Sequence, residues 1–256
     1  MTKSSTTLIG KTYITLSSVD STNDYLKRCL SNNAPIDEGT VILADTQFAG
    51  RGQQGNQWLA ESGSNLTFSV LLKPSFLPVN EQFNLNKAIC VGIITALTKY
   101  VGMGVTIKWP NDIYYGNGKL GGVLIENIVV GNRLRYAIVG IGININQVAF
   151  SIKGVNVLSL RNITGEVYDK MDILTELCSK LEEKYLLLNG DKSTKTFIDN
   201  LYSNRLLGLH EVRRFLIHGE EKRAIMRGVK QDGSIMLEIE AQRFSFGLKE
   251  ISWLFD

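Results

Sequence analysis

The sequence predicts an α+β fold in which strands and long helices share a large first part and a small all-β part follows. Continuous apolar runs at 40–45 (TVILAD) and 66–72 (LTFSVLL) indicate buried strands. Apolar residues recur at helical spacing over 84–101. After Leu207 the pattern changes to short apolar runs separated by turn sequences such as Asp232-Gly233, which are typical of hairpins. We therefore expect two domains, residues 1–207 and 208–256.

Capping residues, glycine and proline mark the boundaries of the expected helices and strands. A polar cluster begins a helix at Ser21-Thr22, where either hydroxyl can cap and Asp24 lies in the first turn. Gly102 ends the long helix that starts near residue 84, and Pro110 keeps Trp109 extended. The other expected elements are strands at 12–16 and 105–109, a hairpin of 123–129 and 134–146, helices at 172–188 and 194–207, and four or five strands within 209–256.

Composition excludes several classes of protein. A net charge of +3 over 256 residues does not support nucleic-acid binding on electrostatic grounds. Cys29, Cys90 and Cys178 are far apart and form no C-x-x-C pair, so we expect core thiols without a disulfide framework or a zinc site. The N-terminal residues lack a signal-peptide core, and no run of about 18 apolar residues is present. We expect a cytoplasmic protein that does not contact membranes.

The segment Gly50-Arg51-Gly52-Gln53-Gln54-Gly55 matches the glycine pattern of dinucleotide-binding turns. In such turns a helix follows and its N-terminus meets the pyrophosphate. Here a strand follows, and no Gly-Lys-Ser/Thr is present, so neither a Rossmann turn nor a Walker loop is favoured. Two interpretations stay open: a surface turn, or a loop whose N–H groups and Arg51 hold an anion.

Three further segments are candidates for a site, each with a structural alternative. Strand alternation places Lys108 opposite the apolar Val105 and Ile107; it is either a solvated strand end, the commoner case, or a cation near a phosphate. Asn111-Asp112 is explained by an Asx turn. The strand at 138–146 carries Gly140, Gly142, Asn144 and Asn146 on one face, which favours close approach of either a ligand or a packed helix.

Five motifs occur together in one order, and the set is far more specific than any member. They are Ser21-Thr22-Asn23, the stretch from Gly50 to Trp58, Lys108-Trp109-Pro110-Asn111-Asp112, the stretch from Gly121 to Glu126, and Gly140-Ile141-Gly142-Ile143-Asn144. In this order they resemble the biotin protein ligases, from about Tyr13 to the end of the chain.

The resemblance implies a mixed β-sheet flanked by helices, similar to class II aminoacyl-tRNA synthetases, with a small C-terminal SH3-like β-barrel. It implies that biotin and ATP, with Mg²⁺, form biotinyl-5′-AMP, and that a lysine of a biotin carboxyl carrier domain then takes the biotin. Such chemistry needs positioning and charge stabilisation more than a covalent enzyme intermediate. We therefore expect the partner to be the carrier domain of a biotin-dependent carboxylase, and we expect the protein to be a monomer or a homodimer.

The resemblance also assigns residues. The catalytic cations are Lys108 and Arg51. Biotin is bound by Ser21, Thr22, Asn23, Gln47, Gly50, Arg51, Gly52, Gln53, Lys108, Gly122 and Gly142. The nucleotide is bound by Arg51, Trp58, Lys108, Asn111 and Asn144, and no metal ligands are assigned. Gln54 departs from the family pattern, in which arginine is usual, and this predicts looser retention of the adenylate.

A related ligase for lipoate or octanoate is one alternative, and a non-catalytic biotin sensor is another. A nucleotide-dependent oxidoreductase rests only on the glycine pattern and ranks last. Only 20 residues precede Ser21, too few for a winged helix-turn-helix, so we expect no DNA binding.

Overall fold

The structure, a computed structural model, describes residues 6–151 and 154–254. Its larger sheet is mixed: the first two strands run parallel and all other neighbours are antiparallel. In spatial order the strands are β1 (Tyr13–Val19), β2 (Val41–Gln47), β3 (Leu66–Leu72), β7 (Arg133–Ile143), β6 (Gly118–Val130), β5 (Asp112–Tyr115) and β4 (Val105–Lys108).

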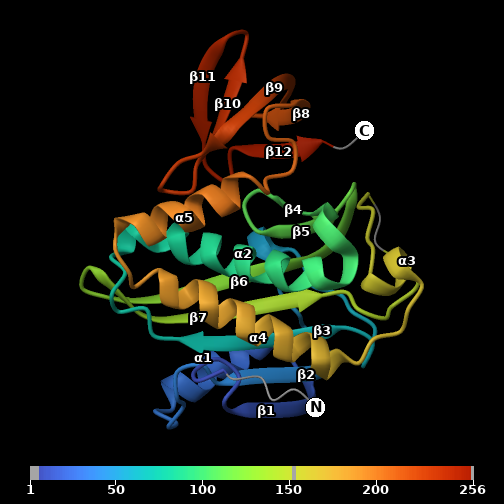
Figure 1. Cartoon of the computed structure of the whole chain (residues 1–256), viewed down its shortest axis with the longest axis vertical. Helices are drawn as coiled ribbons and strands as arrows, with labels where there is room; N and C mark the ends of the chain where they lie inside the picture. The colour runs from blue at the N-terminus through green and yellow to red at the C-terminus, as the bar shows by residue number, and fades with distance from the viewer. Residues whose placement is uncertain (1–5, 152–153, 255–256) are drawn as a thin grey trace.

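Helices cover both faces of this sheet (Figure 1). The helices are α1 (Thr22–Ser31), α2 (Gln82–Val101), α3 (Leu160–Thr164), α4 (Lys170–Leu187) and α5 (Lys192–Ser203). The Ser21 side chain caps α1 by accepting from the Asp24 N–H at 3.5 Å, which settles which hydroxyl caps this helix. Gly102, at φ +69°, ends α2.

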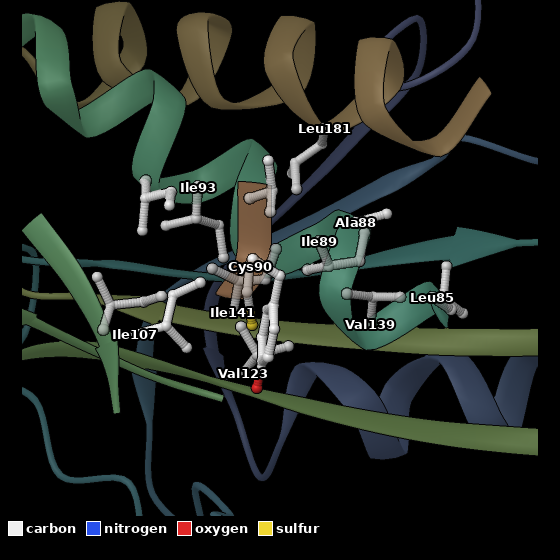
Figure 2. Packing of buried hydrophobic residues seen from close by; sticks show 14 of the residues in the cluster. Leu85, Ala88, Ile89, Cys90, Ile93, Ile107, Val123, Val139, Ile141 and Leu181 are labelled. Carbon is white, nitrogen blue, oxygen red and sulfur yellow. The ribbon is translucent and has the colours of Figure 1, made fainter. Parts of the chain in front are cut away.

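The main core lies between the sheet and α2. The side chains of three α2 residues, Ile89, Cys90 and Ile93, lie between the helix backbone and strand residues such as Val123 and Ile141 (Figure 2). The helical spacing predicted one buried stripe, but Val91 and Ile94 are buried too, because α4 and α5 cover the outer side of α2. Cys90 and Cys178 are core residues as expected, whereas Cys29 is only half-buried.

The segment Val79–Gly104, which contains α2, is long and apolar enough to span a membrane by length and composition alone. Of its most apolar window, 56% is buried inside the fold. A core helix has the same length and composition, and α2 packs as one.

A smaller core lies on the opposite face of the sheet. Leu26 of α1 packs there against Ile42, Leu71 and Ile138, which are all fully buried. This contact fixes α1 over only part of that face, and the remainder of the face borders the candidate site.

The C-terminal strands form a separate antiparallel sheet above the first one (Figure 1). In spatial order they are β11 (Gln242–Phe246), β10 (Ile235–Ile239), β9 (Glu220–Val229), β8 (Val212–Ile217) and β12 (Ile251–Leu254). The Trp109 Nε1–H donates to the Gly233 carbonyl at 2.9 Å and links the two sheets. The expected fold class, a mixed sheet with helices followed by a small β-unit, is therefore confirmed.

Candidate functional site

The floor of the site is a row of residues that pair with one another across neighbouring strands. This row lies on the face of the sheet that α1 leaves uncovered. Paired residues on neighbouring strands share a face, so their side chains meet the same space. From one edge inward, the row contains Lys108, Asp112, Gly122, Gly142 and Thr67. The two central glycines contribute no side chain, and this leaves a floor between the charged end of the row and Thr67.

One cavity of about 280 Å³ stands over this floor. Most of the residues expected to bind substrates line it, although they come from widely separated parts of the chain. They are Ser21, Thr22, Asn23, Gln47, Arg51, Gly52, Gln53, Trp58, Lys108, Asn111, Gly122 and Gly142.

Gly50 and Asn144 do not line the cavity. A Cβ on Gly50 would lie 2.5 Å from the Trp58 carbonyl oxygen and 2.7 Å from Gln47 Nε2, so a glycine is needed for the chain to close there. Asn144 is buried beyond the floor, where its Nδ2 donates to the Leu158 carbonyl at 3.0 Å. Both residues shape the surroundings of the cavity.

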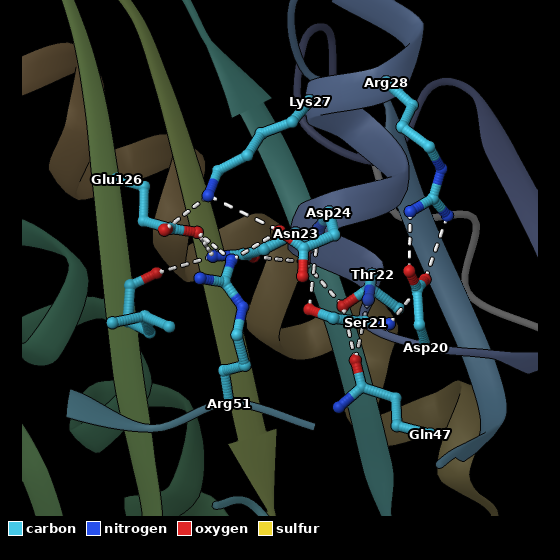
Figure 3. A network of polar contacts seen from close by, with 12 residues as sticks. Asp20, Ser21, Thr22, Asn23, Asp24, Lys27, Arg28, Gln47, Arg51 and Glu126 are labelled. Carbon is cyan, nitrogen blue, oxygen red and sulfur yellow. Dashed lines mark hydrogen bonds and ion pairs between the residues drawn. The ribbon is translucent and has the colours of Figure 1, made fainter. Parts of the chain in front are cut away.

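The polar end of the cavity lies at the N-terminus of α1 (Figure 3). Gln47 Oε1 accepts from the Thr22 N–H at 2.8 Å and from the Thr22 hydroxyl at 3.0 Å. The Ser69 hydroxyl is within 2.6 Å of both Thr22 Oγ1 and Asn23 Oδ1. Thr22, Asn23 and Ser69 are buried, so this network fixes where hydrogen-bonding groups face the cavity.

Arg51 lies in an ion-pair cluster at the rim (Figure 3). Its Nη2 is 2.7 Å from Asp24 Oδ1 and 2.7 Å from Glu126 Oε2, and Lys27 Nζ is 2.6 Å from Glu126 Oε1. Burial alone raises the pKa of Glu126, but hydrogen bonds from Lys27, Asn23 and Arg51 outweigh it and hold the pKa below its ordinary value. The guanidinium thus ties the glycine loop to α1 and β6.

Lys108 stands at the charged end of the row. Burial lowers the pKa of its ammonium; the Asp112 carboxylate opposes this shift and the Lys119 ammonium adds to it. Lys108 Nζ also lies 5.6 Å from the centroid of the Tyr114 ring. Val105 and Ile107 are buried on the other face, so the predicted alternation of this strand is confirmed.

The glycine loop closes on itself and opens no helix. Arg51 and Gln57 form an antiparallel bridge, and the Gly52 N–H donates to the Asn56 carbonyl at 2.6 Å. Between them lies a single 3₁₀ turn, Gln53–Gly55, so the argument against a Rossmann turn is confirmed. The side chain of Gln54 lies outside the described part of the structure.

Trp58 covers one end of the glycine floor. Its Nε1–H donates to Thr67 Oγ1 at 3.3 Å. A Cβ on Gly142 would lie 2.4 Å from the Trp58 ring, so the indole rests directly on the backbone of β7. Only glycine permits this approach.

Sequence reasoning missed several residues of the site. Alternation along the strand at 66–72 places Ser69 beside Thr67 and opposite Phe68, and this signal was available in the sequence. Asp112, expected in a turn, instead begins β5 and pairs with Lys119 at 2.7 Å. No sequence pattern pointed to the part of the wall that the C-terminal sheet supplies, which consists of Phe215, Leu248, Ile251, Ser252 and Trp253.

No cluster of three or more His, Cys, Asp or Glu side chains suited to a metal occurs within residues 6–151 and 154–254. Asp112 is the one carboxylate among the described residues that line the cavity.

Comparisons with known proteins agree on one family. The model of the biotin/lipoate A/B protein ligase family matches residues 15–144, about half of the chain. The bifunctional ligase/repressor BirA of Bacillus spizizenii is 29% identical over 253 residues, covering 96% of this chain and 74% of that protein. The biotin–[acetyl-CoA-carboxylase] ligase of Mycobacterium tuberculosis is 25% identical over 86% of this chain and 80% of its own length.

Solved structures agree as well. The biotin protein ligase from Aquifex aeolicus in complex with biotin and ATP superposes with a TM-score of 0.77 at 29% identity, covering 94% of this chain and 98% of that one. Sequence match, fold and cavity point the same way, and the chain belongs to the biotin/lipoate A/B protein ligase family.

Proposed function

We propose that this protein is an ATP-dependent biotin–protein ligase that modifies a lysine of a biotin carboxyl carrier domain. In the first step a biotin carboxylate oxygen attacks the α-phosphorus of ATP, and the bond to pyrophosphate breaks. In the second step the acceptor amine attacks the acyl carbon of biotinyl-5′-AMP, AMP leaves, and the amine loses a proton. The observation that carries the proposal is one cavity with a buried network of hydroxyl and amide groups at one end and two lysines, Lys108 and Lys119, at the other.

The polar end favours biotin over lipoate. A ureido ring presents a carbonyl acceptor and two N–H donors, which Thr22, Asn23 and Gln47 can match with groups that already face the cavity. A dithiolane ring offers no such groups, so it would form no hydrogen bonds with this network. Lipoate and octanoate are therefore the weaker candidates.

The charged end fits the adenylation step. Negative charge develops on the phosphate oxygens as pyrophosphate leaves, and a fixed cation nearby stabilises it. Lys108 supplies such a cation beside the glycine floor. Magnesium would arrive with ATP and neutralise further phosphate charge.

The walls of the cavity protect the mixed anhydride from hydrolysis. Trp58 and its loop cover one end, and the C-terminal sheet forms part of the wall near Lys108. Water excluded from this space can neither attack the acyl carbon nor weaken the electrostatic contacts. Arg51 anchors this loop, and its proposed contact with the adenylate requires it to leave Asp24 or Glu126.

The test is biotin transfer in vitro. The protein is incubated with biotin, Mg-ATP and a purified carrier domain, and product is detected with streptavidin. We expect a labelled carrier and pyrophosphate release that depends on biotin. The variant Lys108→Ala should keep its fold but lose transfer about a hundredfold or more. Lipoate in place of biotin separates the two substrates, and pyrophosphate release with lipoate alone would contradict the proposal.

The acceptor is a carrier domain of a biotin-dependent carboxylase, and the reaction takes place in the cytoplasm. A sensor without catalysis would bind biotin but release no pyrophosphate, so the same assay distinguishes it.

A further inference from the structure

The segment at 59–64 is held by hydrogen bonds to the segment that follows β7. It forms neither a helix nor a strand, so tertiary contacts must fix its position. Asn65 Oδ1 accepts from the Ile145 N–H at 2.9 Å, and Asn65 Nδ2 donates to Gln147 Oε1 at 2.5 Å. Gln147 Oε1 also accepts from the Glu61 N–H at 3.0 Å. We call these four residues the clasp.

The two side-chain amides of the clasp fix each other's orientation. The Ile145 N–H requires an acceptor, and this turns the Nδ2 group of Asn65 toward Gln147. Gln147 Oε1 then faces two donors, while its Nε2 donates to the Ala149 carbonyl at 2.8 Å. Asn65 is buried, so its amide loses this partner at a cost unless the two segments separate and admit water.

The clasp connects the segment that covers the floor to the strand that forms it. Glu61 follows shortly after Trp58, and Gln147 follows shortly after Gly142. The Trp58 indole rests on the backbone at Gly142, so the clasp holds together the two segments that meet there. Neither Asn65 nor Gln147 lines the cavity, so their effect on a reaction passes through the segments that they hold.

We propose that Gln147 is a positioning residue that keeps the Trp58 segment closed over the cavity while the adenylate waits for its acceptor. This inference rests on the proposed ligase function and names a residue that controls the lifetime of its intermediate. When the segment opens, water instead of the acceptor amine attacks the acyl carbon of biotinyl-5′-AMP. The bond to AMP breaks, and biotin, AMP and a proton are released.

The test compares three variants of the full chain. Gln147→Met keeps the approximate size of the side chain but removes the oxygen that accepts from Asn65 and Glu61. Gln147→Glu keeps an oxygen that can accept both bonds. Gln82→Met is the matched control, because Gln82 Oε1 also accepts from an asparagine amide, Asn127 Nδ2 at 3.0 Å, but between α2 and β6.

Each protein is mixed with biotin and Mg-ATP without a carrier domain, and pyrophosphate is followed over time. A closed site should release about one pyrophosphate per protein molecule in a burst and then little more, because the adenylate stays bound. The slower release after the burst measures the loss of the adenylate. The Tm of each variant is measured on the same samples.

We expect Gln147→Met to keep a full burst and to speed the later release about two- to tenfold, the change expected when about one net hydrogen bond no longer holds the segment closed. Gln147→Glu should stay nearer to the wild type, and Gln82→Met should match it. With a carrier domain present, Gln147→Met should form more AMP for each biotin transferred.

Three results would overturn this role of Gln147. Unchanged later release from Gln147→Met after a full burst would show that Gln147 does not control closure. A smaller burst with a lower Tm and no faster later release would show that the clasp only supports the fold. An equal rise in Gln147→Glu or in Gln82→Met would show that the two accepted bonds are not the cause. A wild-type protein without a biotin-dependent burst would instead defeat the proposed function itself, together with this inference.

Discussion

At the scale of single residues, Lys108 shows how function opposes stability. Burial disfavours its charged form, and the pKa of the ammonium is lowered relative to a lysine in the unfolded chain. Between the folded and unfolded pKa values the unfolded state binds more protons, so the stability of the protein rises with pH in that interval. Below that interval, keeping this lysine charged inside the fold destabilises the protein.

We therefore predict that Lys108→Met abolishes adenylation and raises the Tm. Methionine keeps the volume of the side chain without the buried charge. A gain of about 1 kcal/mol corresponds to about 2–4 °C for a chain of this size. Thermal unfolding at neutral pH and in a more alkaline buffer measures the gain. It should shrink at alkaline pH, where the wild-type lysine becomes neutral, and a lower Tm for the variant would contradict the argument.

At Gly142, the addition of a single carbon atom should change the activity of the protein. A Cβ there would meet the Trp58 ring at 2.4 Å, so Gly142→Ala must displace the indole from β7. We expect the adenylate to hydrolyse before transfer, with more AMP formed for each biotin transferred and at least about tenfold slower labelling. In a Trp58→Ala background the same alanine should add little. Additive effects in this double-mutant cycle would show that Gly142 acts through another contact.

At the scale of elements, the ion-pair cluster joins three segments that are distant in sequence. Asp24 and Lys27 belong to α1, Glu126 to β6, and Arg51 to the glycine loop (Figure 3). The lowered pKa of Glu126 means that its contribution to stability is present at neutral pH, above the unfolded pKa of about 4.3, and is lost as the pH falls through the folded value.

Glu126→Gln should therefore release the loop while preserving the shape of the side chain. We expect a loss of about 1 kcal/mol at neutral pH, because these hydrogen bonds are charge-assisted but partly exposed. The loss should disappear in acid, where the wild-type carboxyl is protonated. Limited trypsin digestion at Arg51 should be faster in the variant. Glu176→Gln, at a surface pair with Lys99, is the control and should leave cleavage of the loop unchanged.

The sequence predicted most elements because their signals are local. Helical spacing, the polar cap at Ser21 and the terminating Gly102 placed α1 and α2 within a few residues. Local patterns were insufficient where tertiary contacts decide. The short β5 forms because β4 and β6 pair with it on both sides, and α2 is buried more widely than its stripe indicates because α4 and α5 cover it.

For the site, the resemblance brought together residues that no local pattern connects. The resemblance identified twelve residues that line one cavity. It also included Gly50 and Asn144, which the structure places outside the lining. Lys119 and Asp112 were missed as a pair because their proximity depends on the register of β5 and β6. The register between two strands cannot be predicted from the residue spacing of either strand alone.

At the scale of the whole molecule, the cavity is closed by both sheets. The first sheet supplies the floor and the polar network, and the C-terminal sheet supplies an apolar part of the wall that includes Phe215 and Trp253. The Trp109 indole, which follows Lys108 directly, bonds to the Gly233 carbonyl of the C-terminal unit. This contact couples the position of the lysine end of the cavity to the second sheet.

Trp109→Phe should weaken this coupling while retaining a large aromatic side chain. We expect about 1 kcal/mol less stability, since one partly buried hydrogen bond is lost. The KM for ATP should rise several-fold, whereas the Kd for biotin should hardly change, because α1 and the first sheet alone build the polar end. Tyr202→Phe is the matched control: it removes a 2.8 Å bond to the Pro110 carbonyl in the same turn without involving the C-terminal sheet. If both variants change the KM for ATP equally, the turn itself affects ATP binding and the coupling between the sheets does not. If biotin binding falls as far as ATP use, the division of the cavity into two ends is wrong.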